Sequence, residues 1–484
     1  MQENNKEDKF QSKSIISNII WKFLERGSSV AVTLLVNVLL ARLLDPSIHG
    51  LLAMVSVFVT ISEIFVTAGL GSALIQKKNA DTLDFSTIFW LNLMVSAALY
   101  ILLFVASPWI SDYFGYSELN LILRVLSLKV IISGVNSVQC AYISRNMMFR
   151  HYFFSTLSGK ILSGIIGVGL AFCGAGVWAL VAQSLSITLV ETIVLWFRVK
   201  WRPTLQFSWN RGKSLYAFAY KIMFTSFVET ITDQLRSLII GKRYSSVDLA
   251  YYNKGALFPN SLTTNVTSAL SAVMYPVLVN RQDDLEQVRA GCRRWISVFA
   301  YSMFPILTGF AATAKTLIPV LLTEKWTASV PYLQIACGIY AAWVIEVPIR
   351  EAIKSIGKAG VCLRIQIIKT ALSLVSLLAV QRFGVMAIAI TTLGCAFVKV
   401  LISTIFGWRY LGYSPKMLMQ DILPPLLLCI TMAICVSLLT LIIYNRFVCL
   451  CVQVIVGAGV YWLGSILTEN STYRYLISLV RKNS

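Results

Sequence analysis

The sequence predicts an all-α polytopic membrane protein with fourteen transmembrane helices. Hydrophobic residues make up 57% of the 484 residues and charged residues only 13%, which is more apolar surface than a soluble core can bury. The apolar runs are about 20 residues or longer and lack the alternation that is typical of barrel strands. Each run is therefore long enough to cross a hydrocarbon core of roughly 30 Å as a helix.

Six predicted spans precede a polar linker and eight follow it. The first six cover 15–41, 47–72, 87–107, 120–143, 153–173 and 176–197. The other eight cover 215–240, 256–279, 295–316, 331–353, 364–380, 384–406, 421–443 and 448–467. The first run is too long for the core of a cleavable signal peptide, so it is predicted to be a retained helix. Asp45 followed by Pro46 predicts a helix start, and Gly174-Ala175-Gly176 predicts a tight hairpin.

The distribution of positive charge predicts the orientation. The net charge is +20, and alternate connections between spans hold roughly three times as many Lys and Arg residues as the others. This asymmetry places both termini in the cytoplasm. Because the charge is scattered over short loops and not gathered in one groove, a nucleic-acid partner is excluded, and an anionic membrane leaflet is the expected counterpart.

The ten cysteines do not indicate a disulfide framework or a metal site. Eight of them lie within predicted spans, where cysteine packs as a small apolar residue: Cys140, Cys173, Cys337, Cys395, Cys429, Cys435, Cys449 and Cys451. Neither His49 nor His151 lies near the closely spaced Cys449 and Cys451. No metal and no cofactor are predicted.

A weak internal repeat predicts two lobes. The segment Ala41 to Ser47 ends the first span, and Gly241 to Val247 ends the seventh, with a small residue, a basic residue and a polar turn in register. Since six spans separate the copies, both run in the same direction, which predicts two pseudo-symmetric six-helix lobes around a central cavity. The predicted parts are an N-terminal tail, the first lobe, a cytoplasmic linker, the second lobe, two additional helices and a C-terminal tail: 1–14, 15–197, 198–214, 215–410, 411–467 and 468–484.

The seventh span carries a polar stripe inside the membrane. Its polar residues recur at intervals of four, four, four and three, which places them on one helical face: Lys221, Thr225, Glu229, Asp233 and Arg236. Charges at this depth are costly, so the face requires water, a partner or a polar ligand.

Several short motifs resemble those of the polysaccharide flippases in the multidrug/oligosaccharidyl-lipid/polysaccharide exporter superfamily. The resemblance runs from about Trp21 to Gly412, and it depends on the order and spacing of motifs, none of which is decisive alone. They are Leu40-Ala41-Arg42-Leu43-Leu44-Asp45-Pro46 with Gly50, Gly69-Leu70-Gly71 with Ala73-Leu74-Ile75-Gln76, Phe89-Trp90-Leu91-Asn92, Arg145 with Phe149, Gly176-Val177-Trp178-Ala179-Leu180, Tyr252-Asn253-Lys254, Tyr275-Pro276, and Lys325-Trp326. The last two spans match less well.

The resemblance implies an exporter of colanic-acid, capsule, O-antigen or teichuronic-acid repeat units. Its substrate would be an undecaprenyl-pyrophosphate-linked oligosaccharide, moved by alternating access across the bacterial cytoplasmic membrane. The implied partners are membrane lipids, sodium ions or protons, and the polysaccharide polymerase machinery. Two alternatives remain open: a cation-coupled multidrug extruder of the same superfamily, and a membrane-embedded glycosyltransferase or ligase. The enzyme is disfavoured because no large loop with catalytic groups is present.

Cationic side chains within spans are the candidates for binding the pyrophosphate, because arginine and lysine recognise phosphate oxygens. They are Lys22, Arg26, Arg124, Lys129, Lys221 and Arg236. For Lys22 and Lys221 the alternative is that the side chain extends to the headgroups, as is expected of Lys160, Lys369 and Lys399. Arg26 can equally pair with Glu25, and Arg124 can face the outer headgroups.

Acidic side chains within spans are the candidates for ion coupling: Glu229, Asp233, Glu25 and Glu63. The alternative is neutral ion pairing, of Asp233 with Arg236 and of Glu346 with Arg350, which are spaced to meet on one helix. A separate pattern, with Ser155, Gly159, Ser163 and Gly167 at every fourth residue, predicts a ridge for close helix packing.

Overall fold

The computed structural model describes the whole chain except residues 1, 78, 470–471, 476 and 479–484. Within helices, the side chains of 2–20, 22–23, 72, 218, 221–222, 229, 272 and 359 also lie outside the description. The described chain divides into two compact units, Met1–Ala250 and Tyr251–Ser484. Each unit is considered by itself below.

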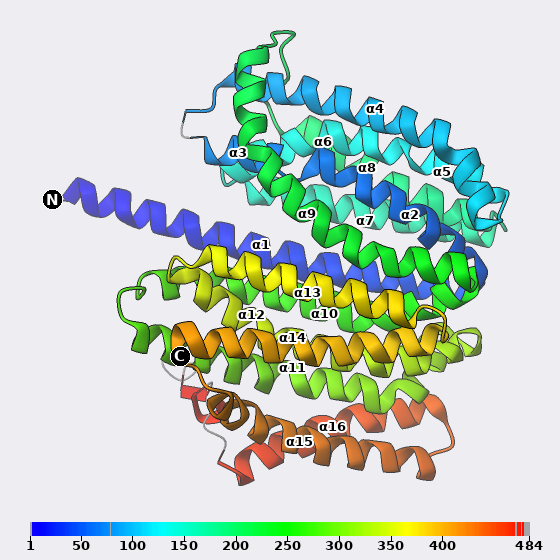
Figure 1. Ribbon diagram of the computed structural model, residues 1–484, viewed down its shortest axis with the longest axis vertical. Helices are drawn as coiled ribbons and strands as arrows, with labels where there is room; N and C mark the ends of the chain where they lie inside the picture. The colour runs from blue at the N-terminus through cyan, green and yellow to red at the C-terminus, as the bar shows by residue number, and fades with distance from the viewer. Residues whose placement is uncertain (1, 78, 470–471, 476, 479–484) are drawn as a thin grey trace. The chain divides into compact units, whose positions relative to one another are not determined.

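The first unit contains nine complete helices among its described residues (Figure 1). They are α1 (Gln2–Leu43), α2 (Pro46–Thr67), α3 (Leu70–Gln76), α4 (Thr82–Phe114), α5 (Glu118–Leu126), α6 (Leu128–Arg145), α7 (Phe149–Phe172), α8 (Val177–Arg198) and α9 (Trp209–Arg243). Helix α7 packs between α1 and α8, and α9 packs along α2, α3 and α4. A buried apolar cluster around Leu74, Phe85 and Ile88 joins α3, α4 and α6 to the residues that precede α9.

Helix α10 (Ser246–Val279) crosses from the first unit into the second. The elements that follow are α11 (Leu285–Leu322), a 3₁₀ helix η1 (Glu324–Ser329), α12 (Val330–Ser355), α13 (Ala359–Val380), α14 (Val385–Leu411), α15 (Pro415–Ile442) and α16 (Arg446–Leu467). Helix α11 packs against α12 as well as α15 and α16, and α14 packs against α12 and α13.

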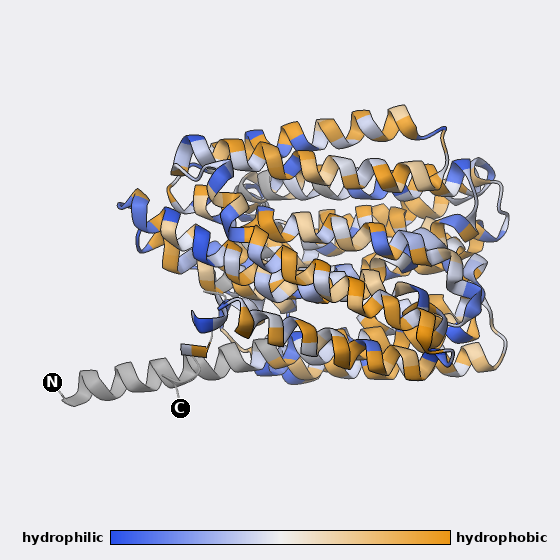
Figure 2. Ribbon diagram, turned by 90° about the horizontal axis from the view of Figure 1, so that it is seen from below, coloured by the Kyte–Doolittle hydropathy of each residue, from blue (hydrophilic) through white to orange (hydrophobic). Residues whose placement is uncertain are grey.

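Thirteen helices of the described residues are long and apolar enough to cross a membrane, so the chain is a multi-pass membrane protein. In Figure 2 hydrophobic residues lie along the helices, and hydrophilic residues gather near the turns. The predicted seventh span does form a helix, α9, but α9 is not among these thirteen. The predicted count of fourteen spans is therefore not shown. The polar stripe of α9 lowers the mean hydropathy of this helix.

The predicted fourth span is one crossing made of two helices. Helix α5 ends at Leu126 and α6 begins at Leu128. Between them the Ser127 hydroxyl donates a hydrogen bond to the Arg124 carbonyl at 3.0 Å, a side-chain bond that competes with the regular helical pattern. The span predicted over 120–143 is confirmed, since Glu118–Arg145 forms one candidate membrane span, with a break in the helix at Ser127.

Backbone turns recur in the same order in the two units. A residue with positive φ follows α4 at Gly115 and α11 at Thr323, with φ of 79° and 81°. Another lies between α6 and α7 at Met147, and its counterpart is Gly357 between α12 and α13. Gly176 before α8 corresponds to Gly384 before α14. The hairpin predicted at 174–176 is confirmed, since both of its glycines have positive φ.

The predicted small-residue ridge is also confirmed as a packing surface. Ser155, Gly159, Ser163 and Gly167 are all buried in α7. A Cβ atom at Gly159 would lie 2.6 Å from Cγ of Glu191, and one at Gly167 would lie 2.7 Å from Cβ of Gln183. Small residues at this spacing let the backbones of α7 and α8 approach closely.

Polar contacts attach the last two helices to α11. Arg293 forms an ion pair with Asp421 of α15 at 2.8 Å. Thr316 donates a hydrogen bond to Gln453 of α16 at 2.6 Å, and the Tyr461 hydroxyl donates to the Tyr301 carbonyl at 2.8 Å. These contacts are distributed along α11 and hold both helices to it.

Candidate functional site

Two predicted site residues with different proposed roles meet in the first unit. Lys129 of α6 lies 3.2 Å from Oε1 of Glu63 in α2, and the Ser133 hydroxyl donates to the same oxygen at 2.7 Å. Both charged side chains are half-buried. The sequence placed Lys129 with the phosphate-binding cations and Glu63 with the coupling carboxylates, whereas the structure makes them one ion pair.

A second set of ionisable groups surrounds Glu191 of α8, which sequence reasoning missed. Glu191 interacts electrostatically with Lys160, Glu25 and Lys129, and the Lys160 ammonium reaches the Ser29 carbonyl of α1 at 3.4 Å. The signal was present, because Glu191 is the one charged residue in the predicted span 176–197. The structure thus places a further carboxylate with Glu25, a predicted coupling residue.

Arg124 is engaged within its own part of the first unit. Its Nε donates a hydrogen bond to the Ser107 hydroxyl at 2.8 Å, and its guanidinium lies 4.4 Å from the centre of the Phe104 ring. Both partners belong to α4. These contacts hold α5 to α4, and the role of Arg124 in binding the pyrophosphate stays a prediction.

The remaining predicted residues lie on α1 and α9. Arg26 is half-buried on α1, Asp233 is exposed on α9, and Arg236 is half-buried one turn further along. The side chains of Lys22, Lys221 and Glu229 lie outside the described residues. The roles of these six residues remain predictions.

The second unit contains a buried ion pair whose partners the sequence did not predict. The Lys369 ammonium of α13 lies 2.6 Å from Oε1 of Glu346 in α12, and the two side chains are only 5% and 11% exposed. The ammonium also donates to the Ser403 hydroxyl of α14 at 2.6 Å. Lys369 was expected to extend to the headgroups, and this expectation was wrong, because its ammonium pairs with Glu346. The alternative that Glu346 pairs with Arg350 is not what the structure shows, since Arg350 pairs with Glu351 at 3.6 Å.

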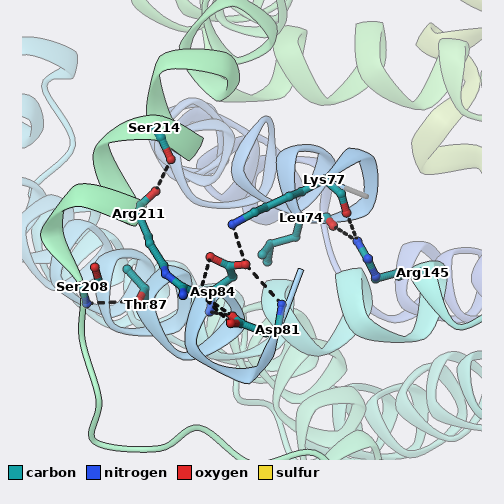
Figure 3. A network of polar contacts seen from close by, with 9 residues as sticks. All are labelled: Leu74, Lys77, Asp81, Asp84, Thr87, Arg145, Ser208, Arg211 and Ser214. Atoms are coloured by element: carbon teal, nitrogen blue, oxygen red, sulfur yellow. Dashed lines mark hydrogen bonds and ion pairs between the residues drawn. The ribbon is translucent and has the colours of Figure 1, made fainter. Parts of the chain in front are cut away.

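Four charged residues form a network at the start of α9, shown in Figure 3; we call Lys77, Asp81, Asp84 and Arg211 the clasp. Arg211 Nη1 lies 2.7 Å from both carboxylate oxygens of Asp81 and 3.4 Å from Oδ1 of Asp84. Lys77 contacts Oδ2 of Asp84 at 2.6 Å. The clasp joins residues about 130 positions apart in the sequence.

The side chains of the clasp differ in how far they are buried. Asp84 is fully buried and accepts a hydrogen bond from the backbone N–H of Asp81 at 3.2 Å, while Asp81 accepts from the N–H of Asp84 at 3.0 Å. This reciprocal arrangement is a capping box at the start of α4. Asp81 and Arg211 are 53% and 39% exposed.

Hydrogen bonds from Arg211 and from the Asp84 N–H lower the pKa of Asp81 from 3.8 to about 2. Because the pKa is lowered in the folded protein, the stabilisation is fully present above about pH 4 and is lost as the pH falls toward 2. The Asp81 carboxylate therefore stays ionised throughout the physiological range.

Two of the sequence motifs meet beside the clasp. Arg145, at the end of α6, donates to the carbonyls of Leu74 and Lys77 at 2.6 and 2.5 Å (Figure 3). These carbonyls lie at the C-terminal end of α3, where helical carbonyls lack partners and favour a cation. Arg145 therefore holds the backbone in place at Lys77, a member of the clasp.

Two other motifs meet in the second unit. The ammonium of Lys254 in α10 is buried and lies 5.4 Å from the centre of the Trp326 ring in η1. Tyr251 packs edge-on against the same ring at 6.0 Å. An ammonium is stabilised over the face of an indole, so these motif residues have a packing role.

The fold is shared with a solved membrane transporter. It resembles the inward closed conformation of the Lipid II flippase MurJ with a TM-score of 0.76, over 96% of this chain and 100% of that one, at 15% sequence identity. The family model described as "Polysaccharide biosynthesis protein" matches residues 39–331. The chain belongs to this family.

Two full-length relatives extend the comparison. A membrane protein in the cps region of Klebsiella pneumoniae is 23% identical over 96% of this chain and 98% of its own length. The succinoglycan biosynthesis transport protein ExoT of Rhizobium meliloti (strain 1021) is 24% identical over 97% and 96%. The resemblance to polysaccharide flippases of the exporter superfamily is confirmed, and the family is one of transporters, not enzymes.

Proposed function

We propose that the protein is a flippase that moves undecaprenyl-pyrophosphate-linked oligosaccharide repeat units across the bacterial cytoplasmic membrane for surface polysaccharide biosynthesis. The observation that carries this proposal is the polysaccharide family match over residues 39–331. Full-length similarity to a succinoglycan transport protein supports it. A glycan carried on a pyrophosphate also suits helices that contain cations at membrane depth.

The proposal also includes a membrane topology that goes beyond the fold described above. Helix α9 would be the fourteenth span, both termini would be cytoplasmic, and two six-helix lobes would face a central cavity, with α15 and α16 as additional helices. The recurrence of a residue with positive φ after α4 and after α11 supports the repeat, and the charge of alternate loops supports the orientation. Alternating access would then expose the cavity to one leaflet at a time.

Deletion of the gene tests the proposed function. We expect the strain to lose its surface polysaccharide and to accumulate lipid-linked repeat units several-fold in the inner leaflet, because the units are made but not translocated. A plasmid copy of the wild-type gene should reverse both effects. Normal translocation combined with increased sensitivity to toxic cations would instead indicate a multidrug extruder.

Substrate binding would be linked to ion coupling through the Lys129–Glu63 pair. The pyrophosphate is a stronger and more highly charged acceptor than one carboxylate, so we propose that it displaces Glu63 from Lys129. The released carboxylate would then hold a proton or a sodium ion during part of the cycle. Arg26, Arg236, Lys22 and Lys221 would supply further cationic contacts, and Glu25, Glu229 and Asp233 the other coupling carboxylates.

Replacing Glu63 by glutamine tests this exchange. We expect transport by Glu63→Gln to lose most of its dependence on an imposed proton or sodium gradient, about tenfold in rate, because the amide keeps the shape of the side chain but cannot exchange a cation. The measurement is uptake of a lipid-linked oligosaccharide in proteoliposomes with and without each gradient. Lys129→Met breaks the same pair yet retains the carboxylate, so we expect a lower transport rate whose remainder still depends on the gradient.

If Glu63→Gln retains the gradient dependence of the wild type, Glu63 has no coupling role. The same assay with Glu229→Gln tests the predicted carboxylate on α9.

A further inference from the structure

Helix α9 is attached to the first unit at its linker end by the clasp and by the preceding segment. The Ser208 N–H donates to the Thr87 hydroxyl at 3.3 Å, and the Thr204 N–H donates to the Ser86 hydroxyl at 3.0 Å. The Trp90 indole N–H donates to the Thr204 carbonyl at 2.8 Å. All three partners lie in the first part of α4, so the linker and the start of α9 follow this one helix.

The far end of α9 is attached by different chemistry. The Lys242 ammonium donates to the Tyr113 carbonyl and lies 4.4 Å from the centre of that residue's ring. A Cβ atom at Gly241 would lie 3.0 Å from the side chain of Met54. This end is held by one cation and by close packing against α2.

Between its ends, α9 makes close packing contacts with other helices of the first unit. A Cβ atom at Gly69, whose φ is +95°, would lie 2.6 Å from the Ala219 carbonyl, and Phe65 packs against Phe227 at 5.3 Å. Packing contacts of this kind can be broken and remade as a helix tilts, but the linker end can move only after Arg211 has separated from its carboxylate partners.

The clasp is built so that Arg211 can leave without unfolding its surroundings. Buried Asp84 keeps Lys77 at 2.6 Å and the Asp81 N–H at 3.2 Å when Arg211 is absent. Because Asp81 and Arg211 are half exposed, solvent screens their attraction and the pair can separate at little cost. The structure therefore combines a permanent part, Lys77 with Asp84, and a detachable part, Arg211.

We propose that the clasp is a reversible latch, in which release of Arg211 from Asp81 and Asp84, together with breakage of the Ser208–Thr87 hydrogen bond, lets the linker end of α9 move during each transport cycle. The inference rests on the proposed function, because a latch has a purpose only if α9 moves between states. Helix α9 is the last complete helix of the first unit, and the second begins at Tyr251. The attachment of α9 therefore limits how far the residues that connect the first unit to the second can move.

The first test measures release directly and needs no substrate. Ala219→Cys is introduced where Ala219 is buried against Gly69, in a protein whose exposed cysteines, Cys173 and Cys451, are replaced by serine. We expect Arg211→Gln to raise the rate of maleimide labelling in nanodiscs at least fivefold, and Arg211→Lys to give an intermediate rate. Lys213→Gln is the matched control, an exposed cation on the same helix outside the clasp, and should label as the parent does.

The second test locks the latch. A disulfide between Thr87→Cys and Ser208→Cys joins two positions whose side-chain and backbone atoms lie 3.3 Å apart. Oxidation should reduce oligosaccharide transport at least tenfold, and reduction with dithiothreitol should restore it.

Unchanged labelling in Arg211→Gln, or full transport by the oxidised double-cysteine protein, would overturn the latch. If the reduced protein transports no lipid-linked oligosaccharide but the labelling rates differ as expected, the latch stands and the proposed function fails.

Discussion

Replacement of Lys369 by methionine is expected to destabilise the protein by about 3–5 kcal/mol, which is the usual cost of leaving one member of a buried ion pair unpaired. Glu346 would lose its ammonium partner at 2.6 Å while only 11% of its side chain can reach solvent. Thermal unfolding of the purified protein in detergent measures the effect as a lower midpoint temperature.

The control for this prediction is the double variant Lys369→Met with Glu346→Leu. Since an apolar pair of similar volume replaces both charges, we expect most of the lost stability to return. Lys358→Met alters an exposed lysine at the start of the same helix and should leave the midpoint unchanged. Equal midpoints for Lys369→Met and the wild type would show that the pair contributes nothing.

Replacement of Gly50 by alanine is expected to cost about 1–3 kcal/mol, which is typical of overpacking. A Cβ atom at Gly50 would fall on the backbone carbonyl of Ser246, which cannot move aside as a flexible side chain can. The start of α10 would have to shift away from α2. A lower thermal midpoint measures the destabilisation.

Gly27 provides the matched control, because it also lies within a helix but has no heavy atom within 4 Å of the position that an added methyl group would occupy. Gly27→Ala should raise stability by about 0.5–1 kcal/mol through helix propensity alone. If both alanine variants behave alike, the close approach at Gly50 carries no energetic weight.

Local patterns in the sequence predicted most of the helices and one packing surface. The ridge from Ser155 to Gly167 was predictable because its residues lie one turn apart, so their shared face follows from helical geometry alone. The hairpin at 174–176 was predictable because glycine is the residue that readily adopts positive φ. Both features depend only on neighbours in the chain.

The partners of charged residues were not predictable in the same way. Asp81 and Arg211 are 130 positions apart and meet only because α9 packs on α4. Lys369 has both an acid and a hydroxyl as partners on two other helices, whereas the sequence suggested only the headgroups. A single sequence gives the depth of a charge in the membrane but not the helix that faces it.

The attachment of α15 and α16 to α11 replaces lipid with polar protein groups along one side of α11. Arg293, Tyr301 and Thr316 all direct polar groups toward this pair of helices. Without Asp421, Ser465 and Gln453 as partners, the same groups would meet acyl chains, which offer no hydrogen bonds. The last two helices therefore act as a polar lining on one side of α11, and they let a transmembrane helix keep residues that lipid alone would exclude.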